Sequence, residues 1–262
     1  MTNAQLSKSV VYLHSPSIRA NEEDIGTGFI VKVIKISDGT SIDFLVTAAH
    51  VASLMQSSAL ITFSSENDIP RTVKITEATG TQIEPQWVTH PKADVAVLPL
   101  NPTAGVKSLF SEVALPFDQL FPPDLQAPVR DCPLTIIGFP LGLGGAILGE
   151  DRKISPISKE TKVSSGLISS PRSDNNVITE FFITDSPSVG GFSGAPAFYP
   201  DVYTDQGAFR TFKARFVVGL VHGTLSDATG GKFALLVPEK FIYETILKAA
   251  QIAFTGKKAL DK

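Results

Sequence analysis

Short apolar runs separated by turn residues dominate the hydrophobic pattern of this chain. They are rich in valine, isoleucine and phenylalanine, and glycine and proline punctuate them. This spacing predicts an all-β fold of barrels or a sandwich rather than βαβ units. The predicted strands are residues 10–13, 28–36, 44–48, 60–63, 95–100, 134–138, 162–169, 177–184, 194–198, 216–222 and 232–237.

Two segments have a helical pattern instead. Residues 50–55 predict a short helix, and residues 239–253 predict a longer one with apolar side chains near helical spacing. Pro238 stands at the start of the longer helix, where its missing N–H costs little. Residues 101–133 are rich in proline and poor in strand signal, so we interpret them as a crossover between two halves.

Composition narrows the class of protein. The chain has 262 residues, 43% of them hydrophobic, which is a globular balance rather than a disordered one. Its net charge of −3, from 23 basic and 26 acidic residues, argues against nucleic acid as the main partner. The single cysteine, Cys132, excludes an internal disulfide framework and a zinc site of several cysteines.

Targeting and metal signals are absent from the sequence. No apolar run approaches the roughly 18 residues that span a bilayer, so we expect no membrane span. The first residues have no signal-peptide pattern, which indicates the cytoplasm, or the periplasm if a leader has been removed. The four histidines have no metal-ligand spacing, and we expect neither a metal nor a cofactor.

His50 and Asp94 each lie at the end of an apolar strand. His50 follows Phe44-Leu45-Val46-Thr47-Ala48-Ala49, whose small last residues allow close packing around an imidazole. Asp94 precedes Val95-Ala96-Val97-Leu98, where a buried carboxylate needs a partner such as a histidine N–H. A structural histidine and a turn-forming aspartate are the simpler interpretations of each segment taken alone.

Ser193 lies in the glycine-rich segment Gly190-Gly191-Phe192-Ser193-Gly194. The glycines permit positive φ and close approach of a substrate. Such a turn can point successive N–H groups at one place, as a developing oxyanion requires. A plain hairpin with an exposed serine is the alternative, but the chain order His, Asp, Ser is one of the known orders of a catalytic triad.

Seven segments together resemble trypsin-like serine proteases of the chymotrypsin fold, most of all the bacterial HtrA/DegP type of protease domain. In the family's order they are Gly26-Thr27-Gly28-Phe29-Ile30-Val31, Val46-Thr47-Ala48-Ala49-His50-Val51, Ala93-Asp94-Val95-Ala96-Val97-Leu98, Ile137-Gly138-Phe139-Pro140-Leu141-Gly142, Val163-Ser164-Ser165-Gly166-Leu167-Ile168, Gly191-Phe192-Ser193-Gly194-Ala195-Pro196 and Phe233-Ala234-Leu235-Leu236-Val237-Pro238.

This resemblance implies two six-stranded antiparallel β-barrels with a C-terminal helix and a site in the cleft between them. Residues 1–118 would form the N-terminal barrel with the crossover, and residues 119–262 the C-terminal barrel and terminal helix, together one protease domain. His50, Asp94 and Ser193 would be the catalytic triad of a serine endopeptidase, and the N–H groups of Gly191 and Ser193 its oxyanion hole.

The substrate side of the site follows from the same resemblance. Leu220, Val221 and His222 would offer a strand edge to an extended protein or peptide substrate. Pro187, six residues before the serine, would lie near the floor of the specificity pocket and favours a small or medium apolar side chain over a basic one. His222 falls one residue later than the specificity histidine of glutamyl endopeptidases, which favours a structural place near Asp94.

Two features depart from the family. Phe192 stands where digestive trypsins carry an aspartate that pairs with a freshly cut N-terminus and HtrA-type relatives carry asparagine, so that route of activation is not expected. No PDZ module is expected after the last strand. Gly190 and Gly191 make the oxyanion loop flexible, which suggests a latent enzyme that a peptide or an activating protein partner orders.

Other classes fit less well. An α/β-hydrolase would want G-x-S-x-G and the order Ser, acid, His, but Ala195 takes the last glycine position and only His222 follows Ser193. Gly142-Leu143-Gly144-Gly145 lacks the third glycine of a phosphate-binding fingerprint and a following helix. The serious alternative is a catalytically silent protease fold that serves as a binding or scaffold protein.

Overall fold

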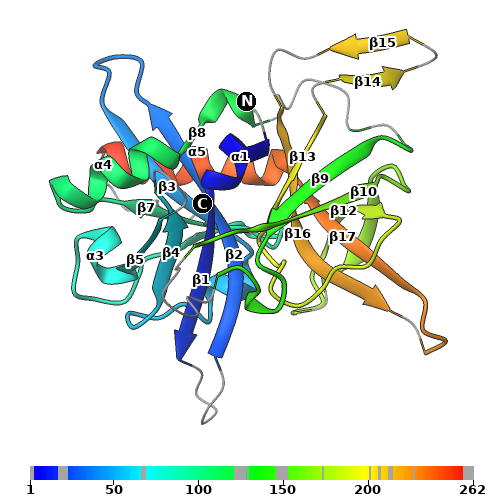
Figure 1. Ribbon diagram of the computed structural model, residues 1–262, viewed down its shortest axis with the longest axis horizontal. Helices are drawn as coiled ribbons and strands as arrows, with labels where there is room; N and C mark the ends of the chain where they lie inside the picture. Colours follow the sequence, from blue (N-terminus) through cyan, green and yellow to red (C-terminus); the bar gives the residue numbers. More distant parts are fainter. Residues whose placement is uncertain are drawn as a thin grey trace.

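The computed structural model describes residues 3–16, 23–65, 69–120, 128, 130–145, 153–172, 174–200, 202–205, 208–211, 215–226 and 228–255. Strands dominate it, and two large antiparallel sheets stand side by side (Figure 1). One sheet comes from the N-terminal part of the chain and the other from the C-terminal part. This architecture is the expected chymotrypsin-like double-barrel arrangement with a C-terminal helix.

The N-terminal sheet has the strand order β5-β4-β1-β2-β3-β7-β6, and β8 pairs with β2 in parallel. It therefore has eight strands rather than the expected six, because two of them are two-residue strands without a clear sequence pattern. Its strands are β1 (Val10–Pro16), β2 (Glu23–Ile34), β3 (Ser41–Thr47), β4 (Leu60–Ser64), β5 (Pro70–Lys74), β6 (Val88–Thr89), β7 (Ala96–Leu100) and β8 (Leu115–Pro116).

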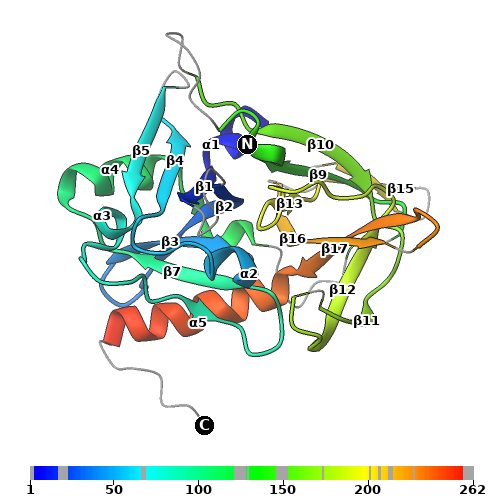
Figure 2. The same ribbon diagram turned by 90° about the horizontal axis from the view of Figure 1, so that it is seen from below.

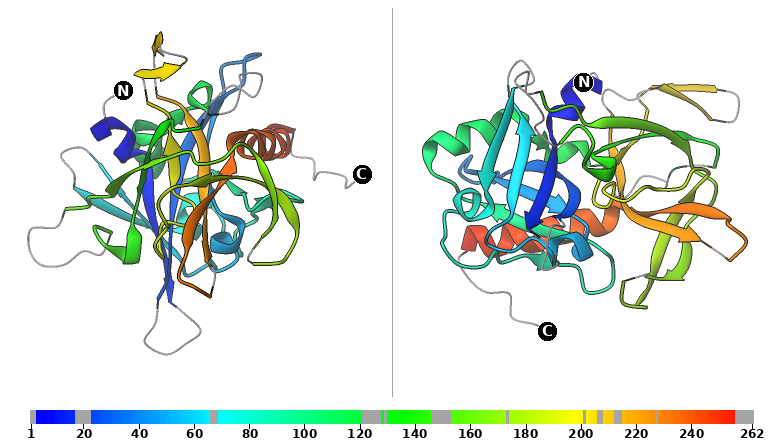
Figure 3. Two further views of the ribbon diagram at one scale, coloured as in Figure 1. Left: turned by 90° about the vertical axis from the view of Figure 1, so that its right-hand side faces the viewer. Right: turned by 60° about the horizontal axis from the view of Figure 1, so that its bottom comes forward.

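The C-terminal sheet has the strand order β10-β9-β13-β16-β17-β12-β11, seven strands instead of six. A separate hairpin, β14 (Val202–Asp205) with β15 (Ala208–Thr211), projects from this half (Figures 1 and 3). The strands of the sheet are β9 (Pro133–Gly138), β10 (Ile157–Lys162), β11 (Ile168–Pro171), β12 (Ile178–Thr184), β13 (Pro196–Phe198), β16 (Val217–Ser226) and β17 (Lys232–Pro238).

The predicted strand over residues 162–169 is wrong. The chain pairs as β10 up to Lys162, bends, and resumes as β11 at Ile168. Ser164 and Ser165 explain the bend: Ser164 N–H donates to the Ile183 carbonyl at 2.8 Å, while the Ser165 hydroxyl accepts the Ile183 N–H at 2.9 Å. A serine side chain replaces a backbone partner there and interrupts the ladder.

Helices are few in the described chain and lie around the sheets. The short helix α2 (Ala49–Ala52) follows β3 directly, and the helix α5 (Glu239–Thr255) runs back from β17 across the N-terminal sheet (Figure 2). The others are α1 (Asn3–Lys8), α3 (Ile75–Thr79), α4 (Ala104–Val113) and the 3₁₀ turns η2 (Phe117–Gln119) and η3 (Pro140–Gly142). No helix of the described residues is long and apolar enough to cross a membrane.

The expected crossover holds a helix that the sequence pattern did not predict. α4 lies within residues 101–133, and residues 121–127 and 129 of that stretch lie outside the described residues. The division after residue 118 falls between β8 and β9 and stays a prediction. α5 packs on β7, β6 and β3 of the N-terminal sheet and on β16 and β17 of the C-terminal sheet, so the C-terminal segment joins the two halves.

Apolar side chains from both sheets meet between them. Fully buried residues from the N-terminal sheet, such as Phe29 and Leu13, share one core with Phe139 and Leu220 from the other side. A second core lies within the C-terminal sheet and includes Phe192, which is 3% exposed. Burial of the Phe192 ring in this core fixes the loop that carries Ser193 to the sheet below it.

Candidate active site

β3 delivers His50 to the boundary between the two sheets. The strand is buried along Asp43–Thr47, and Ala48, which is 0% exposed, leads directly into α2. The Ser53 hydroxyl donates to the His50 carbonyl at 2.7 Å and holds the first turn of this helix. The His50 side chain remains 29% exposed and lines a cavity.

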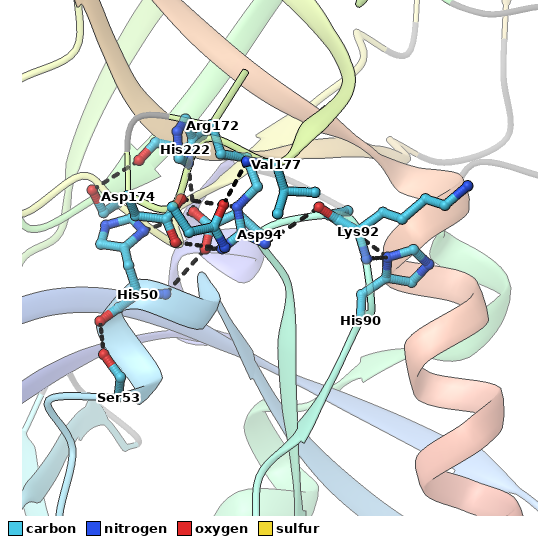
Figure 4. A network of polar contacts seen from close by, with 12 residues as sticks. His50, Ser53, His90, Lys92, Asp94, Arg172, Asp174, Val177 and His222 are labelled. Carbon is cyan, nitrogen blue, oxygen red and sulfur yellow. Dashed lines mark hydrogen bonds and ion pairs between the residues drawn. The ribbon is translucent and has the colours of Figure 1, made fainter. Parts of the chain in front are cut away.

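Asp94 fixes the imidazole of His50. Its Oδ2 lies 2.7 Å from His50 Nδ1, and its Oδ1 accepts the His50 backbone N–H at 3.0 Å (Figure 4). Because a carboxylate accepts, Nδ1 carries the proton and Nε2 is left as the basic nitrogen of a neutral ring. Burial raises the pKa of the Asp94 carboxyl, but hydrogen bonds from His222 and His50 outweigh it and hold that pKa well below its usual range.

His222 binds the same carboxylate. Its Nδ1 lies 2.5 Å from Asp94 Oδ2, its ring stacks on Phe181, and its side chain is 1% exposed. The two imidazole rings meet edge to face with centroids 5.7 Å apart. His222 is therefore a buried neighbour of Asp94, and its ring is not free to select a substrate side chain.

Ser193 lines the same cavity as His50. Its hydroxyl donates to the His222 carbonyl at 3.2 Å, and no hydrogen bond joins it to His50 within the described chain. The cavity has a volume of about 260 Å³. Its lining residues are His50, Asp174, Ser188, Val189, Gly190, Ser193, His222, Gly223 and Thr224.

The loop before Ser193 has a defined backbone geometry. The Leu141 N–H donates to the Gly190 carbonyl at 2.6 Å, and Gly191 has φ +91°. In a trans peptide the N–H points away from the carbonyl, so the Gly191 N–H is directed away from Leu141. Across the described residues, neither this N–H nor that of Ser193 meets an acceptor.

Thr27 of β2 ties this loop to the other sheet. Its hydroxyl donates to the Gly191 carbonyl at 2.7 Å and accepts the Phe139 N–H at 3.0 Å. Its own N–H donates to the Ser193 carbonyl at 3.0 Å. Gly194 packs so closely beside it that a Cβ there would lie 2.1 Å from the Thr27 carbonyl oxygen, which only glycine avoids.

The predicted substrate edge needs correction in two of its residues. Leu220 and Val221 are fully buried and have neighbours on both sides, since β16 pairs with β17 and contacts β13 and the Ser193 loop. Beyond them Gly223 and Thr224 keep only the β17 partner among the described strands. The open edge therefore begins at His222 rather than ending there.

Pro187 does not line the cavity. It is exposed, and its carbonyl accepts a hydrogen bond from the Lys159 ammonium. The residues nearest in sequence that do line it are Ser188, Val189 and Gly190. A bend after β12 turns Pro187 outward, which sequence position alone did not indicate.

Arg172 and Asp174 belong to the site but gave no signal in the sequence. Arg172 is 5% exposed, and its Nη2 lies 3.1 Å from Asp94 Oδ1. Asp174 accepts hydrogen bonds from the same guanidinium and lines the cavity. Charged residues in a turn usually face solvent, so only the tertiary structure identifies this pair.

His50, Asp94 and His222 also form a cluster of metal-ligating side chains whose ligand atoms lie within 4.8 Å of one another. Asp94 Oδ2 is already occupied by two imidazole N–H donors, and a buried guanidinium contacts Oδ1. A cation would have to displace these donors beside an existing positive charge. The donor set fits a hydrogen-bonded cluster and does not fit a metal site.

Two antiparallel sheets with a histidine, an aspartate and a serine gathered at their junction define the class of chymotrypsin-like double-barrel proteins. A family model described as the trypsin-like peptidase domain matches residues 26–201, more than half of the chain. The chain belongs to the trypsin-like peptidase family. No curated protein matches it in sequence.

Solved structures share its fold at low sequence identity. The MamO protease domain of Magnetospirillum magneticum is 16% identical, with a TM-score of 0.57 over 92% of this chain and 96% of that one. The Rv3671c protease of M. tuberculosis in its active form is 17% identical, with a TM-score of 0.52 over 99% of this chain and 86% of that one. The HtrA-type protease AlgW with a tripeptide is 17% identical, with a TM-score of 0.55, and the match covers 98% of this chain and 65% of that one.

Proposed function

We propose that this protein is a serine endopeptidase that hydrolyses peptide bonds through an acyl-enzyme on Ser193. The observation that carries the proposal is the hydrogen bond of buried Asp94 to His50, which lines the same cavity as Ser193. The 2.7 Å hydrogen bond assigns the proton to Nδ1 and leaves Nε2 as the base. A protein or peptide is the substrate, and a metal or cofactor has no role in the proposed reaction.

The proposed reaction has two steps. Ser193 Oγ attacks the substrate carbonyl carbon while His50 Nε2 takes the hydroxyl proton, and His50 then gives that proton to the leaving amine. Water attacks the resulting ester with His50 again as the base, which releases the second product. Asp94 holds the imidazole orientation and stabilises the imidazolium that forms in each step.

The N–H groups of Gly191 and Ser193 are the proposed oxyanion hole. Their support is the Leu141 hydrogen bond, which turns the Gly190 carbonyl away and directs the Gly191 N–H to the opposite side. A single donor in such a hole is worth about 3–4 kcal/mol of transition-state stabilisation.

We further propose that an extended substrate adds to the edge of β16 from His222 to Thr224. Val189 is the one branched apolar side chain of the cavity lining, and glycines, serines and Thr224 make up much of the rest. This lining supports a small uncharged substrate side chain in the pocket. Asp174 already binds Arg172, so it offers no free charge for a basic side chain.

The Ser193 hydroxyl bears on the question of latency. It donates to the His222 carbonyl, which is the first acceptor on the proposed substrate edge. A substrate N–H that takes this acceptor would release the hydroxyl to turn toward His50. This competition supports a resting state that the peptide itself converts, and an activating protein partner is the other candidate.

Labelling with a fluorophosphonate probe tests the proposal, because the probe requires an activated serine and an oxyanion hole. Intact mass should show one adduct on the wild type and none on Ser193→Ala or His50→Gln. Ser108→Ala is the control, since Ser108 is an exposed serine of α4 that does not line the cavity, and it should label at the wild-type rate.

Absence of an adduct on the wild type, with and without a library of extended peptides, would refute the endopeptidase proposal and favour a binding or scaffold role. Labelling only when peptides are present would establish latency. Prompt labelling of the isolated protein would refute latency and support the endopeptidase proposal.

A further inference from the structure

Arg172 is a buried cation at the site that the triad chemistry does not use. It lies in the turn between β11 and β12, where its N–H donates to the Val177 carbonyl at 2.9 Å. The Asn176 N–H donates back to the Arg172 carbonyl at 3.0 Å, so Arg172 is tied to the start of β12 by its own backbone. From there the side chain reaches into the site and is 5% exposed (Figure 4).

The guanidinium completes the hydrogen-bonding of Asp94. Asp94 Oδ2 faces the two imidazole Nδ1 atoms, and Oδ1 accepts from the His50 backbone N–H and from Arg172 Nη2. Arg172 Nη1 also donates to the Lys92 carbonyl at 3.3 Å. Four donors thus fix the plane of the carboxylate, and the Arg172 donor comes from the C-terminal sheet.

The contact between Arg172 and Asp94 also balances the negative charge of the buried carboxylate. Asp94 is 0% exposed, and an ionised carboxylate buried without a counterion is very costly. His50 must be neutral to act as a base, so it cannot be that counterion in the resting state. The charged or titratable groups that face His50 are Asp94, His222 and the Arg172–Asp174 pair, and Arg172 is the permanent cation among them.

We propose that Arg172 is a positioning residue that keeps Asp94 ionised and oriented while His50 is neutral. This inference rests on the proposed endopeptidase function. Asp174 accepts from Arg172 Nε at 2.8 Å and from Nη2 at 2.5 Å, so it holds the guanidinium in the plane that serves Asp94. Arg172 itself does not line the cavity, so a substrate there would meet Asp174 and His50 rather than the guanidinium.

The test is a titration of the ring nitrogens of ¹⁵N-histidine-labelled protein by NMR, with His50 assigned by its loss in His50→Gln. In Arg172→Gln a neutral donor replaces the cation, and the midpoint of the His50 titration should rise by on the order of one pH unit. Arg172→Lys keeps the charge, so its midpoint should stay within about 0.3 pH unit of wild type. Arg71→Gln, on an exposed residue of β5, is the matched control and should change nothing.

Enzyme kinetics supply the second readout. Arg172→Gln should lower kcat about tenfold and change KM less than about twofold, because the contact is with Asp94 and not with substrate. The acid limb of the pH–rate profile should move in the same direction as the NMR midpoint. If Arg172 served only to stabilise the fold, Arg172→Gln would lower the amount of folded protein and leave the NMR midpoint and the acid limb of the pH–rate profile unchanged.

An unchanged His50 midpoint in folded Arg172→Gln overturns the inference. If that variant does not fold, Arg172→Lys decides: it lacks the planar fork, so kcat should fall at least about threefold, and a wild-type kcat overturns the inference. The titration needs no turnover. A wild type that never labels with the probe but shows the Arg172-dependent midpoint would refute the proposed function alone.

Discussion

Replacing Thr27 by valine should loosen the loop that carries Ser193. Valine has the shape of threonine without the hydroxyl, and the site is fully buried. The substitution removes the donor to the Gly191 carbonyl at 2.7 Å and the acceptor for the Phe139 N–H at 3.0 Å. Both backbone groups belong to buried residues, so each loses its partner without gaining water.

The expected magnitude follows from these two orphaned groups. Each costs about 1–3 kcal/mol, and the additional buried methyl group offsets about 1 kcal/mol, so we expect a loss of about 1–5 kcal/mol of unfolding free energy. For a chain of this size that loss lowers the Tm by about 2–20 °C. The Gly191 peptide also loses its tie to β2, and the rate of probe labelling should fall about 10- to 100-fold.

Calorimetry and fluorophosphonate labelling measure the two effects on the same samples. Thr27→Ser is the control, because it keeps the hydroxyl and loses one buried methyl group, worth about 1 kcal/mol. It should retain most of the labelling rate. If Thr27→Val is as stable as wild type and labels as fast, the Thr27 hydroxyl does not hold the loop that carries Ser193 and the prediction is wrong.

Three further predictions concern stability and reactivity. Burial raises the pKa of Glu239 from 4.5 to about 7, so the protonated form is favoured in the folded state. The stabilisation that the protonated Glu239 carboxyl gives the folded state is fully present below pH 4.5 and is lost as pH rises through 7. The unfolding free energy therefore falls by about 3 kcal/mol over that pH range. Glu239→Gln should flatten this dependence in urea titrations, and an unchanged slope would contradict it. Gly194→Ala should destabilise by about 2–5 kcal/mol, because φ is +85° and the Cβ would meet Thr27 and Thr47, whereas Gly166→Ala, in open space, should be nearly neutral by calorimetry. Burial raises the pKa of the Cys132 thiol, so iodoacetamide should alkylate it only after unfolding, and prompt alkylation of the folded protein would show that the thiol is accessible.

Local pattern was enough for much of the fold. Strand centres such as residues 44–48, 95–100 and 232–237 were predicted because apolar β-branched runs report burial on a sheet without knowledge of their neighbours. The long helix α5 followed from its periodicity and from Pro238. The His50 and Asp94 segments were recognised for the same reason, since each motif occupies a few consecutive residues.

The structural features that the local sequence pattern did not predict depend on partners that are distant in the sequence. β6 and β8 are two-residue strands that exist only because β7 and β2 offer them an edge. The open edge of β16 begins at His222 because β13 and the Ser193 loop pair with Leu220 and Val221 before it. No window of sequence contains both members of such a pair.

The strand-rich class, the order His50, Asp94 and Ser193, and the family resemblance could all be predicted from the amino-acid sequence, because they are properties of short segments and their order. The three-dimensional fold was needed to show that Arg172 shares Asp94 with two histidines and that the Thr27 hydroxyl binds the Gly191 carbonyl of the Ser193 loop. The partners in those contacts lie 78 and 164 residues apart. These contacts form when the two sheets dock. The Asp94 carboxylate and the Gly191 carbonyl are then buried away from water, so they need Arg172 and Thr27 as hydrogen-bond partners.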